Sequence, residues 1–238
     1  MIETVFFTAD GLRLHGTLHM PDHPAPPLVI GCHGLLATGE SPKQKALADR
    51  LNRLGIAYFR FDHRGCGKSD GVFSAVTSFA GRCSDLLAAV SALKGKLGLK
   101  GPLGFFGSSL GGAVALWTAG DTETRAVATL AAPVRFTAIR VPSSYETDPT
   151  FSGMQREAMF FDIGGRLPSV HDVLVCHGHA DQVVPFTNAT EIYLSAAAPK
   201  DIVIFPGGDH PLSRPAHQQR FMDRTVGWFQ SRLAPDLP

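Results

Sequence analysis

Short apolar runs alternate with helical patterns along most of this 238-residue chain. The runs are rich in β-branched and aromatic residues and are bounded by Gly, Pro or polar residues, as buried strands are. They predict eight strands, at residues 3–8, 12–20, 28–32, 56–61, 103–107, 126–131, 172–176 and 202–205. Asp10-Gly11 between the first two runs is a strong hairpin signal, so we expect an antiparallel pair at one edge of the sheet.

The segments between the later strands carry the helical period. Ser41-Pro42 provides an N-cap with Pro at the first helical position, and Leu47, Leu51 and Leu54 follow on one face. Further helices are predicted at 79–97, 113–119, 188–197 and 215–233. Strands that alternate with helices predict a parallel sheet covered on both faces, in an α/β fold.

The alternation stops between Pro133 and Val170, where no clear strand is found. The segment is rich in Pro, Ser and Gly, yet it holds several large apolar residues. A connection this long inside a compact domain usually has a function. We therefore expect a single domain, residues 1–238, with a small lid insertion at about 133–170.

The sequence Gly107-Ser108-Ser109-Leu110-Gly111 lies between a predicted strand and a predicted helix. A sharp strand-to-helix turn exposes the central serine hydroxyl above the sheet, and it crowds the residues two before and two after that serine. Glycine satisfies both positions. The helix that follows directs its first N–H groups toward the same point, where they can stabilise an oxyanion.

Other polar residues also stand directly after predicted strands. His33-Gly34, Asp62, Asp181 and His210 each follow a different strand. In open α/β sheets, ligands bind at the carboxyl ends of the strands. These residues are therefore expected at the same edge of the sheet as Ser109.

Taken together, these motifs resemble the α/β-hydrolase superfamily over nearly the whole chain. The order Ser, Asp, His along the sequence is the order of that superfamily, and Asp62-x-Arg64-Gly65-x-Gly67-x-Ser69 adds to the match. The lid and the H-G-x-A-D-x-x-V-P element look like those of serine aminopeptidase-type and feruloyl-esterase-type hydrolases. The resemblance implies the α/β-hydrolase fold, with a mostly parallel eight-stranded sheet.

The resemblance also assigns roles to individual residues. Ser109 is the expected nucleophile, His210 the general base and then acid, and Asp181 the carboxylate that orients the imidazole. The backbone N–H groups of Leu35 and Leu110 are expected to form the oxyanion hole.

Several residues compete for these roles. Asp209 adjoins His210, but neighbouring side chains in a loop rarely face each other, so Asp181 is preferred. Asp62 is an alternative acid, although anchoring its glycine-rich loop is the favoured role. His177 and His179 have the spacing of a metal pair, but no further ligand cluster completes a site, and we expect no metal and no cofactor.

The large residues of the insertion are candidates for a substrate pocket. An acyl or aryl group could pack against them, and the alternative is that they simply hold the insertion on the core. The candidates in the insertion are Phe136, Tyr145, Phe151, Met154 and Phe160. His33, outside the insertion, is a further candidate, which either braces the oxyanion loop or borders the pocket.

Composition narrows the choice of partners and compartment. The net charge is +1 and no basic tract is present, so nucleic acid and anionic membranes have no electrostatic support. We find no signal peptide and no apolar run long enough to cross a membrane. The dispersed cysteines Cys32, Cys66, Cys83 and Cys176 are typical of a reducing compartment, so we expect a cytoplasmic protein.

The favoured function is hydrolysis of a small to medium carboxylic ester through an acyl-enzyme, with a homodimer left open. A peptidase or amidase is the first alternative, and it needs an anchor for a charged chain end such as Arg140, Glu146, Asp148 or Glu157. A thioesterase is the next. A slow-turnover sensor on a hydrolase scaffold belongs to another class of function, because fold alone does not establish activity.

Overall fold

The computed structural model describes residues 1–96, 98–140 and 153–234. Eight strands are found in this part of the chain, and they form one sheet. In chain order they are β1 (Ile2–Ala9), β2 (Leu12–His19), β3 (Leu28–Cys32), β4 (Ala57–Phe61), β5 (Leu103–Ser108), β6 (Thr124–Leu130), β7 (Val173–Gly178) and β8 (Lys200–Phe205).

The helices lie between and after the strands. The α-helices are α1 (Pro42–Arg53), α2 (Phe73–Val76), α3 (Phe79–Ser91), α4 (Leu110–Ala119), α7 (Thr187–Ser195) and α8 (Pro215–Leu233). A π-helical turn, η1 (Ala92–Lys96), extends α3, and the 3₁₀ turns η2 (Phe136–Ala138), η3 (Arg156–Met159) and η4 (Gly164–Ser169) lie in the predicted insertion. The short α2 and the three 3₁₀ turns carry no sequence period and were not predicted, whereas η1 falls within the helix predicted at 79–97.

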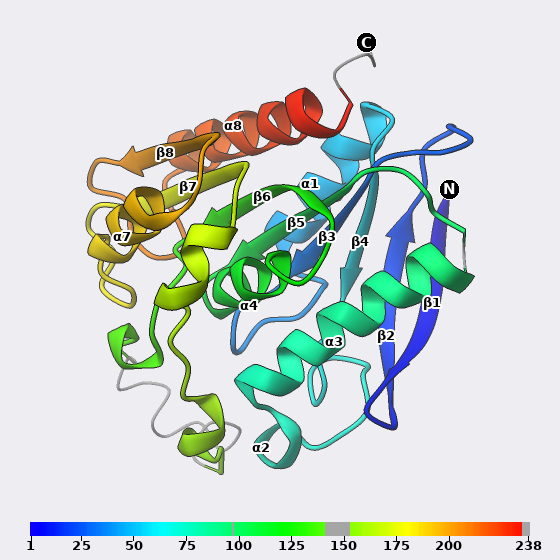
Figure 1. Ribbon diagram of the computed structural model, residues 1–238, viewed down its shortest axis with the longest axis horizontal. Coiled ribbons are helices and arrows are strands. Elements are labelled where there is room, and N and C mark those ends of the chain that lie inside the picture. The colour runs from blue at the N-terminus through cyan, green and yellow to red at the C-terminus, as the bar shows by residue number, and fades with distance from the viewer. Residues whose placement is uncertain (97, 141–152, 235–238) are drawn as a thin grey trace.

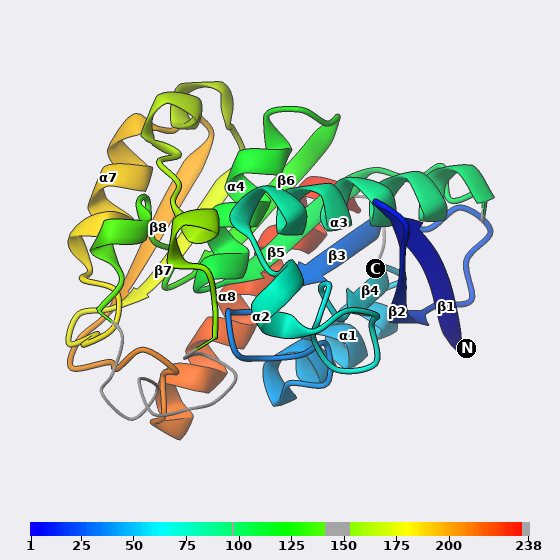
Figure 2. The same ribbon diagram turned by 90° about the horizontal axis from the view of Figure 1, so that it is seen from below.

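The strands are ordered β1-β2-β4-β3-β5-β6-β7-β8 across the sheet. The β1–β2 and β2–β4 pairs are antiparallel and the others are parallel. Figures 1 and 2 show α3, α4 and α7 on one face and α1 and α8 on the other. The expected mostly parallel eight-stranded sheet with helices on both faces is confirmed.

Side chains from successive strand positions enter two separate cores, because they point alternately to the two faces of the sheet. On β5, Phe105 packs in the core beneath α3 and α4, and Phe106 packs in the core beneath α1 and α8. The insertion joins the first of these cores through Met159, Ile163 and other buried residues. Among the described residues, no helix has the length and apolar character needed to span a bilayer.

Turn chemistry explains the ends of several elements. Asp10 and Gly11 have φ values of 49° and 80°, and these left-handed conformations suit the two-residue turn between β1 and β2. The side chain of Ser41 caps α1 by accepting a hydrogen bond from the Gln44 amide at 3.4 Å. The predicted N-cap and hairpin are therefore confirmed.

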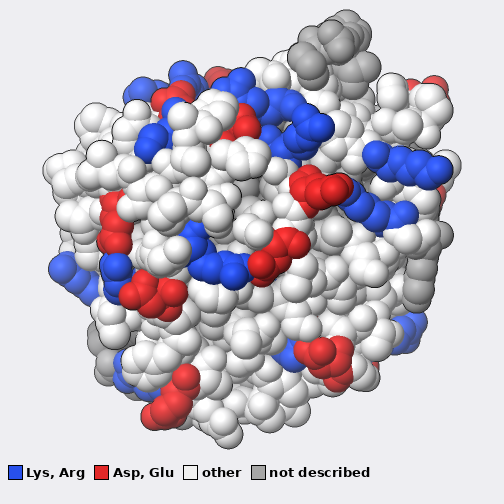
Figure 3. All heavy atoms as spheres, in the orientation of Figure 1, with Lys and Arg blue, Asp and Glu red and all other residues white. Residues whose placement is uncertain are grey.

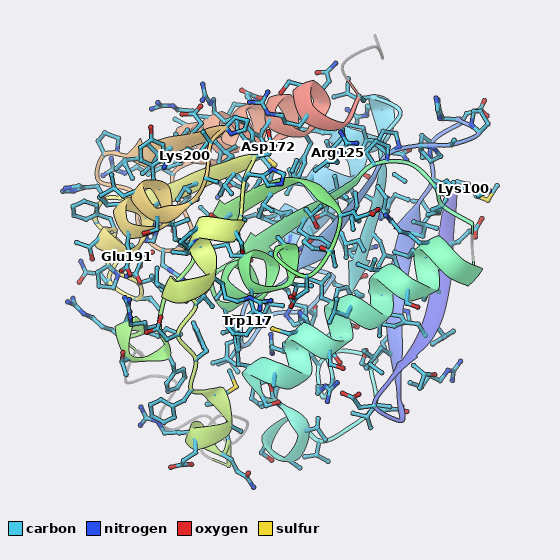
Figure 4. The ribbon with its side chains drawn as sticks, viewed as in Figure 1. Lys100, Trp117, Arg125, Asp172, Glu191 and Lys200 are labelled. Carbon is cyan, nitrogen blue, oxygen red and sulfur yellow. The ribbon has the colours of Figure 1, made fainter. Side chains whose placement is uncertain are left out.

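The parallel strands β3 to β8 all begin along one edge of the sheet, and the polar loops follow their ends at the opposite edge. In Figure 4, the labelled residues Lys100, Arg125, Asp172 and Lys200 mark the starts of β5, β6, β7 and β8 along the upper edge. The residues predicted to act together all follow strand ends at the opposite edge.

On the face shown in Figure 3, basic and acidic side chains are interspersed.

Buried polar side chains join the loop after β3 to the loop after β4. His33 Nδ1–H donates to the Gly34 carbonyl at 2.7 Å, and its Nε2 accepts from the His63 amide at 3.0 Å. His63 Nδ1–H donates to the carboxylate of Asp85 on α3 at 3.1 Å. Burial lowers the pKa of His63 to about 4, although Asp85 opposes the shift, and burial also lowers the pKa of His33. Both imidazoles are therefore held neutral.

Two glycine substitutions test the role of backbone conformation. Gly11→Ala should destabilise the protein by about 1 kcal/mol, because alanine is strained at positive φ. Gly227→Ala should stabilise it by about 0.5–1 kcal/mol, because Gly227 lies inside α8 with open space around its Cα. Urea unfolding of both variants measures these changes, and equal effects of the same sign would contradict the explanation.

The buried histidines predict a loss of stability in mild acid. In the unfolded chain, the His63 imidazole binds a proton below about pH 6.5. In the folded protein, the same imidazole binds a proton only below about pH 4. The free energy of unfolding should therefore fall as the pH drops through this window. Urea unfolding at pH 7, 6 and 5 measures it, with His63→Gln expected to show a shallower decline. A wild-type value that stays constant from pH 7 to 5 would refute this coupling.

Candidate active site

Ser109 occupies a strained turn between β5 and α4. Its φ and ψ are 52° and −126°, a conformation that residues with side chains rarely adopt. A Cβ on Gly107 would approach the Gly111 carbonyl oxygen to 2.2 Å, and one on Gly111 would approach the Cys32 carbonyl oxygen to 2.3 Å. Only glycine fits at either position, as the sequence motif requires.

His210 and Asp181 complete a continuous line of hydrogen bonds from this serine. The Ser109 hydroxyl lies 3.1 Å from His210 Nε2, so it can donate its hydrogen to the ring. On the other side of the ring, His210 Nδ1–H donates to Asp181 Oδ2 at 2.7 Å. Three residues that are far apart in the sequence thus meet beyond the ends of β5, β7 and β8.

The surroundings of Asp181 keep its carboxylate ionised. Burial raises the pKa of this carboxyl, but hydrogen bonds from His177, His210 and the Val184 amide outweigh burial and hold the pKa well below its usual range. The amides of Val183 and Val184 both donate to Asp181 Oδ1 at 2.8 Å. A fixed anion beside Nδ1 selects the tautomer in which Nε2 is free to accept the serine proton.

His177 also contacts Asp181, and no sequence pattern predicted this contact. Its fully buried ring lies with Nε2 at 3.3 Å from Asp181 Oδ2 and 2.8 Å from the Val184 carbonyl oxygen. His179 instead turns outward and lies against Phe186, with ring centroids 4.6 Å apart. The two histidines therefore do not converge as a metal pair.

Two backbone N–H groups, those of Leu110 and Leu35, are candidates for stabilising an oxyanion beside Ser109. Leu110 is the first residue of α4, where amides have no partner within the helix, and Leu35 lies in the turn after β3. Neither amide donates to a carbonyl among the described residues. Both residues line the cavity described below, so these two donors are available to an oxygen bound there.

Arg82 holds the Leu35 turn in place, and nothing in the sequence pattern singled it out. Its fully buried guanidinium donates to the Leu35 carbonyl at 2.9 Å and to the Gly34 carbonyl at 3.3 Å. Because a buried cation without partners is costly, these bonds fix the turn firmly. A long basic residue within the apolar helical pattern of 79–97 is the only sequence signal for this role.

The alternative acids have other tasks. Asp62 accepts hydrogen bonds from the amides of Gly39 at 2.8 Å and Lys68 at 2.9 Å, so its carboxylate anchors the glycine-rich loop. Asp209 accepts from the amide and the hydroxyl of Ser213. Of the three candidates, Asp181 is the one that contacts the His210 ring.

A cavity of about 870 Å³ lies over Ser109 and His210. Its size falls in the range that accommodates a small organic molecule. Most of its walls are apolar and come from the Leu35 turn, α1, α8 and the loops after β6 and β7, including Leu35, Ala46, Leu130, Ile139, Val183 and Met222. Ser41, Lys43, Gln218 and Gln219 add polar groups from the first turns of α1 and α8.

The structure corrects the expected position of the pocket wall. His33, Phe136, Met154 and Phe160 do not line this cavity, and Tyr145 and Phe151 lie outside the described residues. His33 is 1% exposed and braces the Gly34 turn from within.

The aromatic residues of the insertion instead cover α3 and α4. Phe136 packs against Phe160 with ring centroids 5.1 Å apart, and Phe161 stacks on Phe79 of α3 at 4.2 Å. Trp117 of α4, labelled in Figure 4, lies against the same Phe79 ring at 5.9 Å. In the described part of the chain, Phe136 and Phe161 extend the core and Phe160 is 57% exposed, whereas the cavity is bordered by the helices of the other face.

Comparisons with known proteins give the family and the relatives of this chain. Residues 23–148 match the family described as serine aminopeptidase, S33. The chain is 30% identical over 248 residues to YfhR of Escherichia coli strain K12, covering 98% of this chain and 82% of YfhR. It is 31% identical over 212 residues to Rv2307c of Mycobacterium tuberculosis strain H37Rv, covering 87% of this chain and 72% of that protein.

Solved structures share the fold. Est1E from Butyrivibrio proteoclasticus, determined with ferulic acid bound, has a TM-score of 0.81 at 22% identity and covers 97% of this chain and 99% of its own. The esterase domain of a Rhodothermus marinus protein has a TM-score of 0.74 at 24% identity, with 98% and 100% covered. These structures show the fold, and the family match over residues 23–148 shows that the chain belongs to the serine aminopeptidase S33 family of α/β hydrolases.

Proposed function

We propose that this protein is a serine hydrolase that cleaves a carboxylic ester through an acyl-enzyme intermediate. The observation that carries the proposal is the line of hydrogen bonds from Ser109 Oγ to His210 (3.1 Å) and from His210 to Asp181 (2.7 Å). A neutral hydroxyl is a weak nucleophile, and a base within hydrogen-bond reach activates it.

In the first half of the reaction, Ser109 Oγ attacks the ester carbonyl carbon while His210 Nε2 removes the hydroxyl proton. Asp181 stabilises the imidazolium that forms. The amides of Leu35 and Leu110 donate to the oxygen of the tetrahedral intermediate, and one such donor contributes about 3–4 kcal/mol to the transition state. The intermediate collapses when His210 gives its proton to the departing alkoxide, so that an alcohol leaves and the acyl group stays on Ser109.

In the second half, water replaces the alcohol. His210 removes a proton from this water as its oxygen attacks the acyl carbon, and the same two amides stabilise the new oxyanion. Collapse returns the proton to Ser109 Oγ and releases a carboxylic acid. Each proton taken up by His210 is passed on within the same half-reaction, so the enzyme returns to its starting state.

The cavity favours an ester over the amino-terminal peptide that the family's description suggests. An aminopeptidase must neutralise a free ammonium group, which calls for a carboxylate near the nucleophile. The described residues that line the cavity include no Asp or Glu, and its walls are largely apolar. Of the anchors named for a peptidase, Arg140 and Glu157 do not line the cavity, and Glu146 and Asp148 lie outside the described residues. Est1E, whose structure holds ferulic acid, and the Rhodothermus marinus esterase domain support the same choice by their fold.

Pre-steady-state kinetics test the acyl-enzyme. With p-nitrophenyl butyrate, the wild type should release p-nitrophenol in a stoichiometric burst followed by steady turnover. Ser109→Ala should show neither phase, because the nucleophile is gone. Ser108→Ala is the matched control, since it removes the adjacent hydroxyl but leaves the turn, and it should retain the burst. A burst that survives in Ser109→Ala would refute the assignment.

Asparagine substitutions test which carboxylate orients His210. Asp181→Asn should lower kcat by about three to four orders of magnitude, because an amide at this position no longer selects the productive tautomer. Asp62→Asn should mainly lower thermal stability, since Asp62 holds the Gly39 and Lys68 amides. Steady-state kinetics and circular dichroism on both variants separate the roles. A larger loss of kcat in Asp62→Asn would reverse the assignment.

A further inference from the structure

Lys43 lines the same cavity as Ser109, where the first turn of α1 forms part of the wall. Its side chain is half-buried. No Asp or Glu oxygen of the described residues lies within ion-pair distance of its ammonium group. Lys45, two residues further along α1, differs on each count: it is exposed, it does not line the cavity, and its Nζ lies 2.7 Å from Glu40 Oε2.

The position of Lys43 is electrostatically unfavourable within the protein itself. The N-terminus of a helix carries partial positive charge, so a cation in the first turn is repelled. The first turn of α1 contains no acidic residue that would offset this repulsion. Burial lowers the pKa of the Lys43 ammonium, and the negative charge of Asp209 opposes that shift. An anion bound beside Lys43 would relieve both the repulsion and the loss of hydration.

The neighbouring polar groups are already engaged. The Asp209 carboxylate receives hydrogen bonds from the amide and hydroxyl of Ser213. Gln219 pairs with Arg50 and Asp223, and Ser41 Oγ accepts the Gln44 amide as the helix cap. The Ser41 hydroxyl keeps its own hydrogen to donate, but Lys43 is the one Lys or Arg among the described residues that line the cavity, so it supplies the cationic donor there.

We propose that Lys43 binds a carboxylate at the end of the substrate remote from the scissile ester. The site then selects an ester with an apolar chain over Ser109 and an anionic group at the α1 end. This inference rests on the proposed ester hydrolysis and adds the chemical class of the substrate. It agrees with the cavity, where one cationic side chain from α1 stands among largely apolar walls.

The test compares two series of p-nitrophenyl esters that differ only in charge. One series is the half-esters of straight-chain dicarboxylic acids from adipate to azelate, and the other is the corresponding neutral methyl esters. The spontaneous hydrolysis rate is subtracted for each compound. The measured quantity is the ratio of kcat/KM for the anionic ester to that for its neutral partner, in the wild type, Lys43→Met, Lys43→Arg and Lys45→Met.

The wild type should prefer the anionic ester at one or two chain lengths, and Lys43→Met should lower the ratio about tenfold, as expected for the loss of one charge-assisted hydrogen bond. Lys43→Arg should keep most of the preference, and Lys45→Met should keep the wild-type ratio. Raising the NaCl concentration should weaken the preference in the wild type. A ratio that is equal in the wild type and Lys43→Met at every chain length would overturn the proposal.

Failure of the proposed function is distinguishable from failure of this inference. Hydrolysis of neutral esters with no effect of Lys43 would leave the esterase standing and reject the anion site. If no ester is hydrolysed, the esterase proposal fails, and calorimetric titration with adipamic acid and with adipamide tests the anion site directly. Tighter binding of the acid that is lost in Lys43→Met would support the site, and equal binding of both compounds would reject it.

Discussion

The conformation of Ser109 is the constraint on which the site depends. At φ 52° its backbone lies in a region that costs a residue with a side chain about 1–3 kcal/mol. The strand pairing of β5 on one side and the packing of α4 on the other hold it there, and Gly107 and Gly111 allow the two chain segments to approach. The same turn presents the Ser109 hydroxyl to His210 and leaves the Leu110 amide at the cavity, so the proposed nucleophile and the proposed oxyanion donor are positioned together.

A buried polar network fixes the turn that carries the Leu35 amide. Arg82 holds the Gly34 and Leu35 carbonyls, and the His33–His63–Asp85 chain ties the turn to the next loop and to α3. These groups are buried and neutral or paired, so they hold the Leu35 turn, and with it the Leu35 amide, in a fixed position. Preorganised donors of this kind need no rearrangement during the reaction, which is why they stabilise a transition state effectively.

Local chemistry predicted the elements well, because the Ser41 cap, the Asp10-Gly11 turn and the Gly-x-Ser-x-Gly turn each specify a backbone conformation from adjacent residues. The line from Ser109 through His210 to Asp181 was also foreseen, since each residue follows its own strand. The role of Arg82 was not, because it depends on how α3 packs against a distant turn. The pocket wall was misplaced for a similar reason: Phe136 and Phe160 are apolar wherever they pack, and their sequence does not reveal which face of the sheet they cover.

Covalent labelling tests the central claim, that Ser109 is a nucleophile activated by His210, most directly. The protein is incubated with diethyl p-nitrophenyl phosphate, which phosphorylates an activated serine, and peptides are analysed by mass spectrometry. We expect one diethylphosphoryl group, on Ser109, and labelling that is at least a hundredfold slower in His210→Ala. No adduct, an adduct on Ser108, or equal labelling of His210→Ala would contradict it.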